Sequence, residues 1–128
     1  MYLGNNLISW SPKKQPIVSR STVESEYRAL ALATSETLWI TYLLKELKVS
    51  IIHCDNKSAE ALANNPKYHS GTKHIELDLH FIRDYIAQKE LWINHVPNYD
   101  QVADTFTKLL VIDQLNYLKS KLNVLPRP

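Results

Sequence analysis

A short apolar run that ends in an aspartate and passes directly into a helix most limits how this chain can fold. The run reads IIHCDNKSAEALANN, from Ile51 to Asn65. Its first four residues predict a strand, and the alanine-rich segment predicts a short helix that ends before Pro66. In α/β proteins, ligand sites open at the carboxyl ends of such strands. Asp55 stands at that position, so it is either a catalytic carboxylate or the polar residue that begins the helix.

The rest of the chain predicts the order β-β-α-β-α-α-β-α-α, a mixed sheet covered by helices in an α/β fold. A Gly-Asn-Asn turn joins the first two strands, with the second expected around Leu7 to Ser11. Further segments are predicted as a strand (LWINHVP) or as helices (TKHIELDLHFIRDYIAQK, YDQVADTFTKLL and IDQLNYLKSKL). Core positions are expected for one face of the second long helix and of the last helix, and for all three tryptophans: Ile75, Leu79, Ile82, Ile86, Ile112, Leu115, Leu118, Leu122, Trp10, Trp39 and Trp92.

The longest helix is predicted from Ser21 to Leu47, and it places two glutamates differently. Ser21 and Glu24 have the spacing of a capping box, so Glu24 is interpreted as a cap or a solvated residue. Glu26 lies in line with an apolar stripe, where a carboxylate needs a partner or a function. The other members of that stripe are Leu30, Ala33, Thr37, Ile40, Leu44 and Leu47.

Composition excludes several classes of protein. The 128 residues suit one small domain, residues 1–128, and no apolar run reaches the ~20 residues of a membrane helix. The N-terminus has no features of a signal peptide, and the single cysteine fits a reducing compartment, so we expect an intracellular protein, cytoplasmic or nuclear and not secreted. A net charge of +2 does not by itself indicate a nucleic-acid partner.

Three acids occupy positions at which α/β folds place active sites: Glu26 in the first turns of a helix, Asp55 after a strand, and Asp104 early in a later helix. Clustered carboxylates favour a divalent cation, and oxygen ligands suit Mg²⁺ or Mn²⁺. Such metal sites are typical of phosphodiester hydrolysis, although spacing alone leaves solvated acids as the alternative. Cys54 is interpreted as an inert core residue. The i,i+4 pairs formed by His74 and Asp78, and by Glu76 and His80, are expected to be helix-surface pairs.

The string of motifs resembles the ribonuclease H domain of Ty1/copia-type retrotransposon polyproteins. It comprises ISWSPKKQPIVSRSTVESEYRALA, LLKEL, CDNKSAEALANNP, TKHIELDLHFIRD, VPNYDQVADTFTK and LKSKLNV, and covers nearly the whole chain. The resemblance implies a ribonuclease H-like fold and Mg²⁺-dependent hydrolysis of the RNA strand of an RNA–DNA hybrid. It also implies a parent polyprotein that includes a reverse transcriptase. The family's acids fall on Glu26, Asp55 and Asp104.

The family's first central strand, which carries a fourth acid in a segment resembling Asp-Ala-Asp-Trp, has no counterpart in the chain. Its absence implies weakened metal binding, impaired activity and marginal stability, because the neighbouring strands lose a shared hydrogen-bonding partner. On the first hypothesis the chain is a ribonuclease H module whose Lys13, Lys14 and Arg20 contact hybrid phosphates. On the alternative it is a truncated, non-catalytic remnant with at most weak nucleic-acid binding. A solvated basic loop is the other interpretation of the three basic residues.

Overall fold

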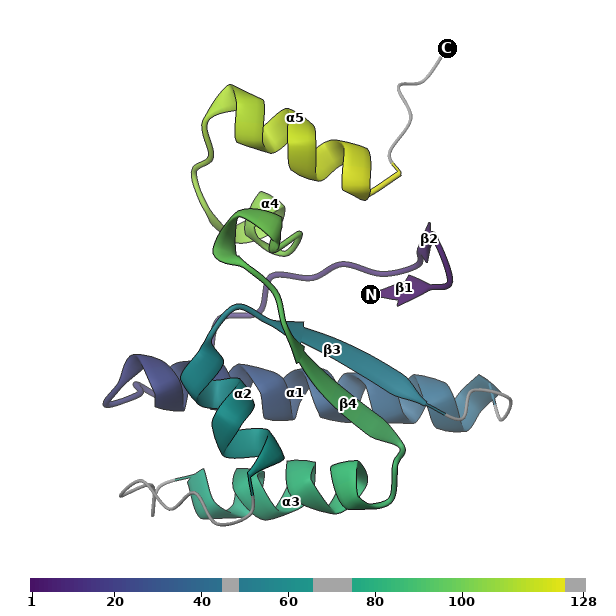
Figure 1. Cartoon of the computed structure of the whole chain (residues 1–128), viewed down its shortest axis with the longest axis vertical. Helices are drawn as coiled ribbons and strands as arrows, with labels where there is room; N and C mark the ends of the chain where they lie inside the picture. The colour runs from purple at the N-terminus through teal and green to yellow at the C-terminus, as the bar shows by residue number, and fades with distance from the viewer. Residues whose placement is uncertain (45–48, 66–74, 124–128) are drawn as a thin grey trace. The chain divides into compact units, whose positions relative to one another are not determined.

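The fold alternates helices and short strands in the predicted order (Figure 1). The computed structural model describes residues 1–44, 49–65 and 75–123. Its strands are β1 (Tyr2–Leu3), β2 (Asn6–Leu7), β3 (Ser50–Cys54) and β4 (Leu91–His95). Its helices are α1 (Thr22–Leu44), α2 (Lys57–Asn64), α3 (Glu76–Ala87), a 3-10 helix (Asn98–Asp100), α4 (Asp104–Thr107) and α5 (Ile112–Lys121).

The chain divides into two compact units, and each is described by itself. The central unit is Gln15–Val96, which contains α1, β3, α2, α3 and β4. The terminal unit combines Met1–Lys14 with Pro97–Pro128. No helix among the described residues is long and apolar enough to cross a membrane.

A parallel pair of strands, β3 and β4, organises the central unit. Their register pairs Ser50 with Leu91 and Cys54 with His95. Side chains alternate along both strands: Leu91 and Ile93 are buried, whereas the side chain of Trp92 between them is exposed. Because α1, α2 and α3 contact one another as well as the strands, they cover one face of the pair. The opposite face of the two strands is exposed.

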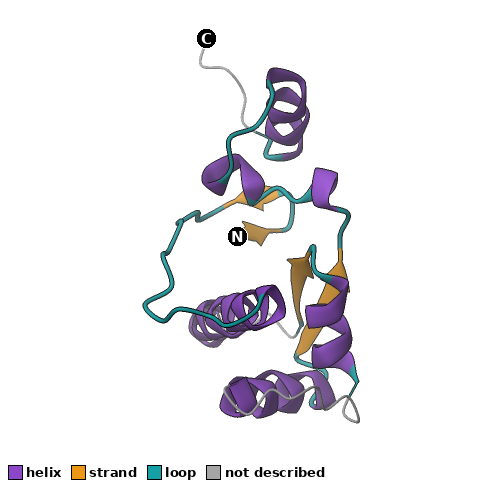
Figure 2. Cartoon of the chain, turned by 90° about the vertical axis from the view of Figure 1, so that its left-hand side faces the viewer, coloured by secondary structure: helices purple, strands orange, loops and turns teal. Residues whose placement is uncertain are grey.

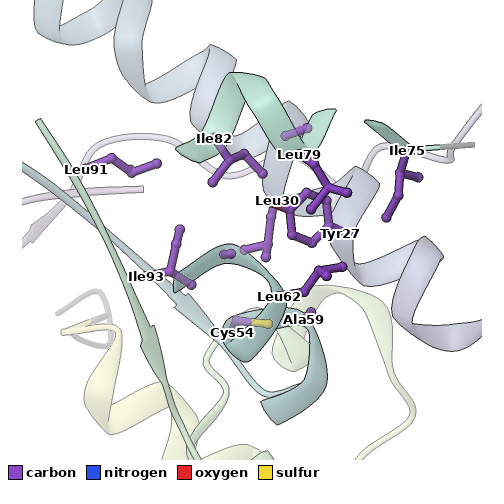
Figure 3. Close-up of a cluster of buried hydrophobic side chains, with 12 residues drawn as sticks. Tyr27, Leu30, Cys54, Ala59, Leu62, Ile75, Leu79, Ile82, Leu91 and Ile93 are labelled. Atoms are coloured by element: carbon purple, nitrogen blue, oxygen red, sulfur yellow. The ribbon is translucent and has the colours of Figure 1, made fainter. Parts of the chain in front are cut away.

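The apolar core lies between the strand pair and the three helices (Figure 3). Tyr27 and Leu30 enter it from α1, and Leu62 enters from α2. From the segment that begins α3 come Ile75, Leu79 and Ile82, so the apolar face predicted there is confirmed, with Ile86 partly buried against it.

The start of α1 confirms the predicted capping interaction. The Ser21 hydroxyl accepts a hydrogen bond from the Glu24 N–H at 3.1 Å. The Glu24 carboxylate reaches back to the N–H of Arg20, at 2.9 Å, and pairs with Arg28 at 3.0 Å. Glu24 is buried, so it caps the helix and is not a solvated residue.

The apolar stripe predicted on α1 was wrong in its orientation. Apart from Leu30, the expected stripe is at most partly buried, and Leu44 is 40% exposed. The fully buried side chains are instead Tyr27 and Thr34, with Leu30 and Ala31 between them. Thr34 is compatible with the core because its hydroxyl donates to the Leu30 carbonyl at 2.8 Å. Leu47 lies outside the described residues.

Arg83 joins α3 to the carboxyl end of α2. Its guanidinium donates to the Leu62 carbonyl at 2.7 Å and to the Asn65 carbonyl at 2.8 Å. The last carbonyls of a helix lack partners inside the helix. Arg83 therefore satisfies backbone groups of α2 and fixes the packing of the two helices at once.

In the terminal unit, β1 and β2 form a two-residue antiparallel hairpin through Gly4, whose φ of +61° suits glycine. The second strand is shorter than predicted. Asp100 accepts hydrogen bonds from Tyr117, at 2.7 Å, and from Lys121, so α5 is linked to the 3-10 helix. These hydrogen bonds lower the pKa of Asp100, and the hydrogen bond that Lys121 donates to Asp100 is the largest cause that raises the pKa of Lys121 to about 12.

The last third of the chain departs from the predicted helices in two places. The single helix expected over YDQVADTFTKLL is replaced by the 3-10 helix and the four-residue α4. On α5, Leu118 and Leu122 are buried as expected, but Ile112 is 75% exposed. Ile112 is the first residue of the helix.

The strands do not form the single mixed sheet that was expected. Among the described residues, β1 pairs only with β2, and β3 pairs only with β4. The α/β class is supported by this mixture of helices and small sheets.

The expectation that the tryptophans are core residues was wrong for all three. Trp10, Trp39 and Trp92 are 62%, 54% and 52% exposed. Trp92 lies on the uncovered face of the strand pair, and the Trp39 indole N–H reaches only the neighbouring Glu36, at 3.0 Å.

The Tyr27 hydroxyl gives a first testable prediction, because it is buried and has no hydrogen-bond partner in the described part of the chain. Such a group costs ~1–3 kcal/mol, so we expect Tyr27→Phe to raise the free energy of unfolding by about 1 kcal/mol.

Burial also raises the pKa of Tyr27 above its ordinary 10.0. The unfolded chain therefore ionises first, and stability is lost as the pH rises above about 10. Tyr27→Phe should reduce that alkaline loss.

Urea unfolding at pH 7 and pH 11 measures both effects. Tyr85→Phe is the matched control, since Tyr85 is only partly buried. A loss of stability in Tyr27→Phe at pH 7 would show that the hydroxyl is hydrogen-bonded.

A second prediction concerns Arg83. Arg83→Met keeps most of the side-chain volume but leaves the Leu62 and Asn65 carbonyls without their donor, and we expect it to cost about 1–3 kcal/mol. Thermal unfolding followed by circular dichroism measures the loss. Arg28→Met removes an i,i+4 helix pair and leaves the Glu24 carboxylate the Arg20 N–H as a partner, so it should cost under about 1 kcal/mol. Equal losses in the two variants would contradict the role given to Arg83.

Candidate active site at the end of β3

Asp55 follows β3 directly and lies partly buried at the edge of the core. The adjacent helix is capped by its neighbour, Asn56, whose side-chain oxygen accepts from the N–H groups of Ser58, at 3.0 Å, and Ala59, at 3.1 Å. The interpretation of Asp55 as the polar residue that begins the helix is therefore wrong, since the Asn56 side chain makes the cap. Because Asn56 caps α2, the start of this helix does not itself require a carboxylate at position 55.

Glu26 is brought to Asp55 by the packing of α1 against β3. The ligand atoms of Glu26, Cys54 and Asp55 all lie within 4.8 Å of one another. Both carboxyl side chains belong to partly buried residues. Glu26 and Asp55 are 29 positions apart in the sequence, and their spacing alone is weak evidence for a shared site. The fold brings them into one cluster.

Cys54, a core residue by its sequence context, borders the two carboxylates. Its sulfur accepts from the Asn56 N–H at 3.4 Å. Burial is the main cause that raises the pKa of the Cys54 thiol, and the charges of Glu26, Asp55 and Glu60 add to it. The prediction that Cys54 is a buried core residue is confirmed.

The chemistry of the cluster suits a hard divalent cation. Carboxylates so close repel each other when ionised, and a cation between them relieves that repulsion. Their oxygens are ligands that Mg²⁺ and Mn²⁺ prefer. The residues present therefore fit Mg²⁺ or Mn²⁺.

Asp104, the third expected acid, is the first residue of α4 in the terminal unit. It is only 6% exposed, and its carboxylate is 2.9 Å from the Lys108 ammonium. Lys108 also donates to the Asn98 side chain at 3.3 Å. A lysine therefore already balances the charge of Asp104, and the i,i+4 spacing of the two residues is the sequence signal for this pair.

The basic residues expected to contact phosphates are exposed. Lys13 and Lys14 lie in the terminal unit and Arg20 lies in the central unit. Two pairs at helical spacing could have held a metal, and His74 of the first pair lies outside the described residues. His80 is exposed on α3 together with Glu76, which is compatible with a surface pair.

Comparison with known proteins identifies the origin of the chain. It is 44% identical over its whole length to the retrovirus-related Pol polyprotein from transposon RE2 of Arabidopsis thaliana. It is 45% identical over 97% of its length to the corresponding polyprotein from transposon RE1 of the same plant. It is 36% identical over 80% of its length to the one from transposon TNT 1-94 of Nicotiana tabacum.

The chain spans only 9% of the length of the two Arabidopsis relatives. No protein-family model matches it, and no solved structure matches it. The similarity nevertheless extends along the whole chain. The chain therefore corresponds to one short segment of the retrovirus-related Pol polyproteins of Ty1/copia-type retrotransposons.

Proposed function

We propose that the chain is the ribonuclease H segment of such a polyprotein, with a ribonuclease H-like fold, and that its site hydrolyses the RNA strand of an RNA–DNA hybrid. The observation that carries the proposal is the meeting of Glu26 and Asp55 at the carboxyl end of β3. The motif resemblance assigns metal-binding roles to these two residues. Their proximity depends on the fold, and the motifs do not state it, so the geometry supports the proposal independently.

In this proposal the carboxylates of Glu26 and Asp55 hold Mg²⁺ or Mn²⁺, and Asp104 is the third ligand. The metal supplies Lewis-acid activation of the scissile phosphate and of the attacking water. Lys13, Lys14 and Arg20 bind phosphates of the hybrid. In the parent polyprotein the natural partner is the reverse transcriptase, which produces the hybrid.

The fourth acid that the resemblance expects is not among these 128 residues. We therefore expect weak metal binding and weak or absent cleavage by the chain alone. The alternative function is that of a non-catalytic remnant with at most weak nucleic-acid binding. The two differ in whether any metal-dependent cleavage depends on Glu26 and Asp55.

Cleavage of a labelled RNA–DNA hybrid in Mg²⁺ or Mn²⁺ tests the proposed function. We expect weak cleavage that Asp55→Asn and Glu26→Gln each reduce by at least about a hundredfold, because each removes charge from the metal site. Glu24→Gln is the matched control, since it lies on the same helix but serves the cap. It should lower stability by about 1 kcal/mol and leave cleavage of the folded chain unchanged.

The electron paramagnetic resonance signal of Mn²⁺ measures metal binding directly, and this measurement does not require activity. Asp55→Asn should weaken it at least about tenfold, because it removes one of the few anionic ligands. Absence of cleavage by the wild-type chain at every metal concentration would favour the remnant. Binding of Mn²⁺ that is unaffected by either site substitution would contradict the assigned ligands.

Lys108 gives a further prediction within this proposal. Its ammonium, 2.9 Å from Asp104, repels a dication that approaches the same carboxylate. We expect Lys108→Gln to tighten Mn²⁺ binding roughly fivefold, about 1 kcal/mol, because Lys108 is half exposed and its pair is partly screened. Lys121→Gln makes the same change of charge at Asp100 and should leave Mn²⁺ affinity unchanged. Equal effects in the two variants would remove Asp104 from the metal site.

A further inference from the structure

Trp10 is the most exposed tryptophan of the chain, and its surroundings hold it in place. Its ring stacks on that of Phe106 in α4, with centroids 6.4 Å apart and planes 14° from parallel. The indole nevertheless remains 62% exposed, and Phe106 is 37% exposed. A stacked indole that is mostly in solvent presents a flat apolar surface whose burial on binding is favourable.

The stack anchors a segment that has no regular structure of its own. Residues 8–15, between β2 and the start of α1, form neither helix nor strand, as the long loop in Figure 2 shows. The contact with Phe106 restrains Trp10 within this segment. A ligand that stacks on the indole therefore meets a side chain whose freedom is already reduced, which lowers the entropic cost of binding.

The same segment carries cations close to the ring. Lys13 and Lys14, both exposed, follow Trp10 by three and four positions, within about 14 Å along even a fully extended chain. The described part of the terminal unit contains five lysines and three aspartates, and no glutamate, arginine or histidine. The segment therefore combines an aromatic platform with positive charge.

We propose that Trp10 is a stacking platform for an unpaired nucleobase and that Lys13 and Lys14 contact phosphates of the same strand, so that the terminal unit binds single-stranded nucleic acid. An aromatic face beside a positively charged track suits both parts of a nucleotide, whatever its base. Paired bases in a duplex cover their faces with one another, so the site selects unpaired strands. This goes beyond the proposed function, since it requires neither a metal ion nor hydrolysis.

Fluorescence anisotropy with a labelled oligothymidylate, in the absence of divalent cations, tests the proposal on the whole chain. We expect Trp10→Ala to weaken binding about tenfold. Trp10→Phe, which keeps a ring, should bind within about threefold of wild type, whereas Trp10→Leu, which keeps only apolar bulk, should bind like Trp10→Ala. Trp39→Ala is the matched control on another exposed indole and should bind as wild type does.

The two lysines are tested by the salt dependence of the same binding. Replacing Lys13 and Lys14 together by Gln should reduce the slope of log affinity against log salt by about 1.4, whereas Trp10→Ala should leave the slope unchanged. A blunt duplex of the same length should bind more weakly than the single strand.

Two results would overturn the proposal: wild-type binding by Trp10→Leu in a chain with an unchanged circular dichroism spectrum, or no binding by the wild-type chain. Failure of the proposed function would look different. A chain that binds single strands through Trp10 but does not cleave a hybrid would retain this inference and lose ribonuclease activity.

Discussion

The parallel pairing of β3 with β4 is the constraint on which the central unit depends. The pairing aligns the carboxyl ends of the two strands, with Cys54 opposite His95 and the Val96 N–H donating to the Cys54 carbonyl at 2.8 Å. The inward-facing residues of the two strands form the buried face against which all three helices of the unit pack. Because Cys54 is the last buried residue of β3, Asp55 emerges where the core ends.

The packing of α1 against this buried face gives two nearby glutamates different roles. Residues two positions apart on a helix are rotated by about 200°, so Glu24 and Glu26 cannot face the same neighbours. Glu24 turns back to the Arg20 N–H and to Arg28, and it completes the start of the helix. Glu26 lies beside Asp55, where like charges meet unless a cation separates them. One acid thus stabilises the helix, and the other is a candidate metal ligand.

The terminal unit is stabilised by different interactions. Of its described apolar residues, Leu118 and Leu122 are buried, and polar contacts such as that between Tyr117 and Asp100 connect its segments. The stack of Trp10 on Phe106 anchors the basic segment to α4, the helix that begins with Asp104.

The sequence by itself determined the order of the helices and strands, the capping of α1, the apolar face of α3 and the family. These features depend on residues a few positions apart or on motifs that stand in the chain as written. Tertiary structure decided which face of α1 is buried, because Tyr27 and Thr34 are enclosed by segments distant in the sequence. It also decided that Trp10 stays in solvent and that Glu26 meets Asp55. Periodicity describes the polarity of one element, whereas burial and proximity depend on which other elements pack against it.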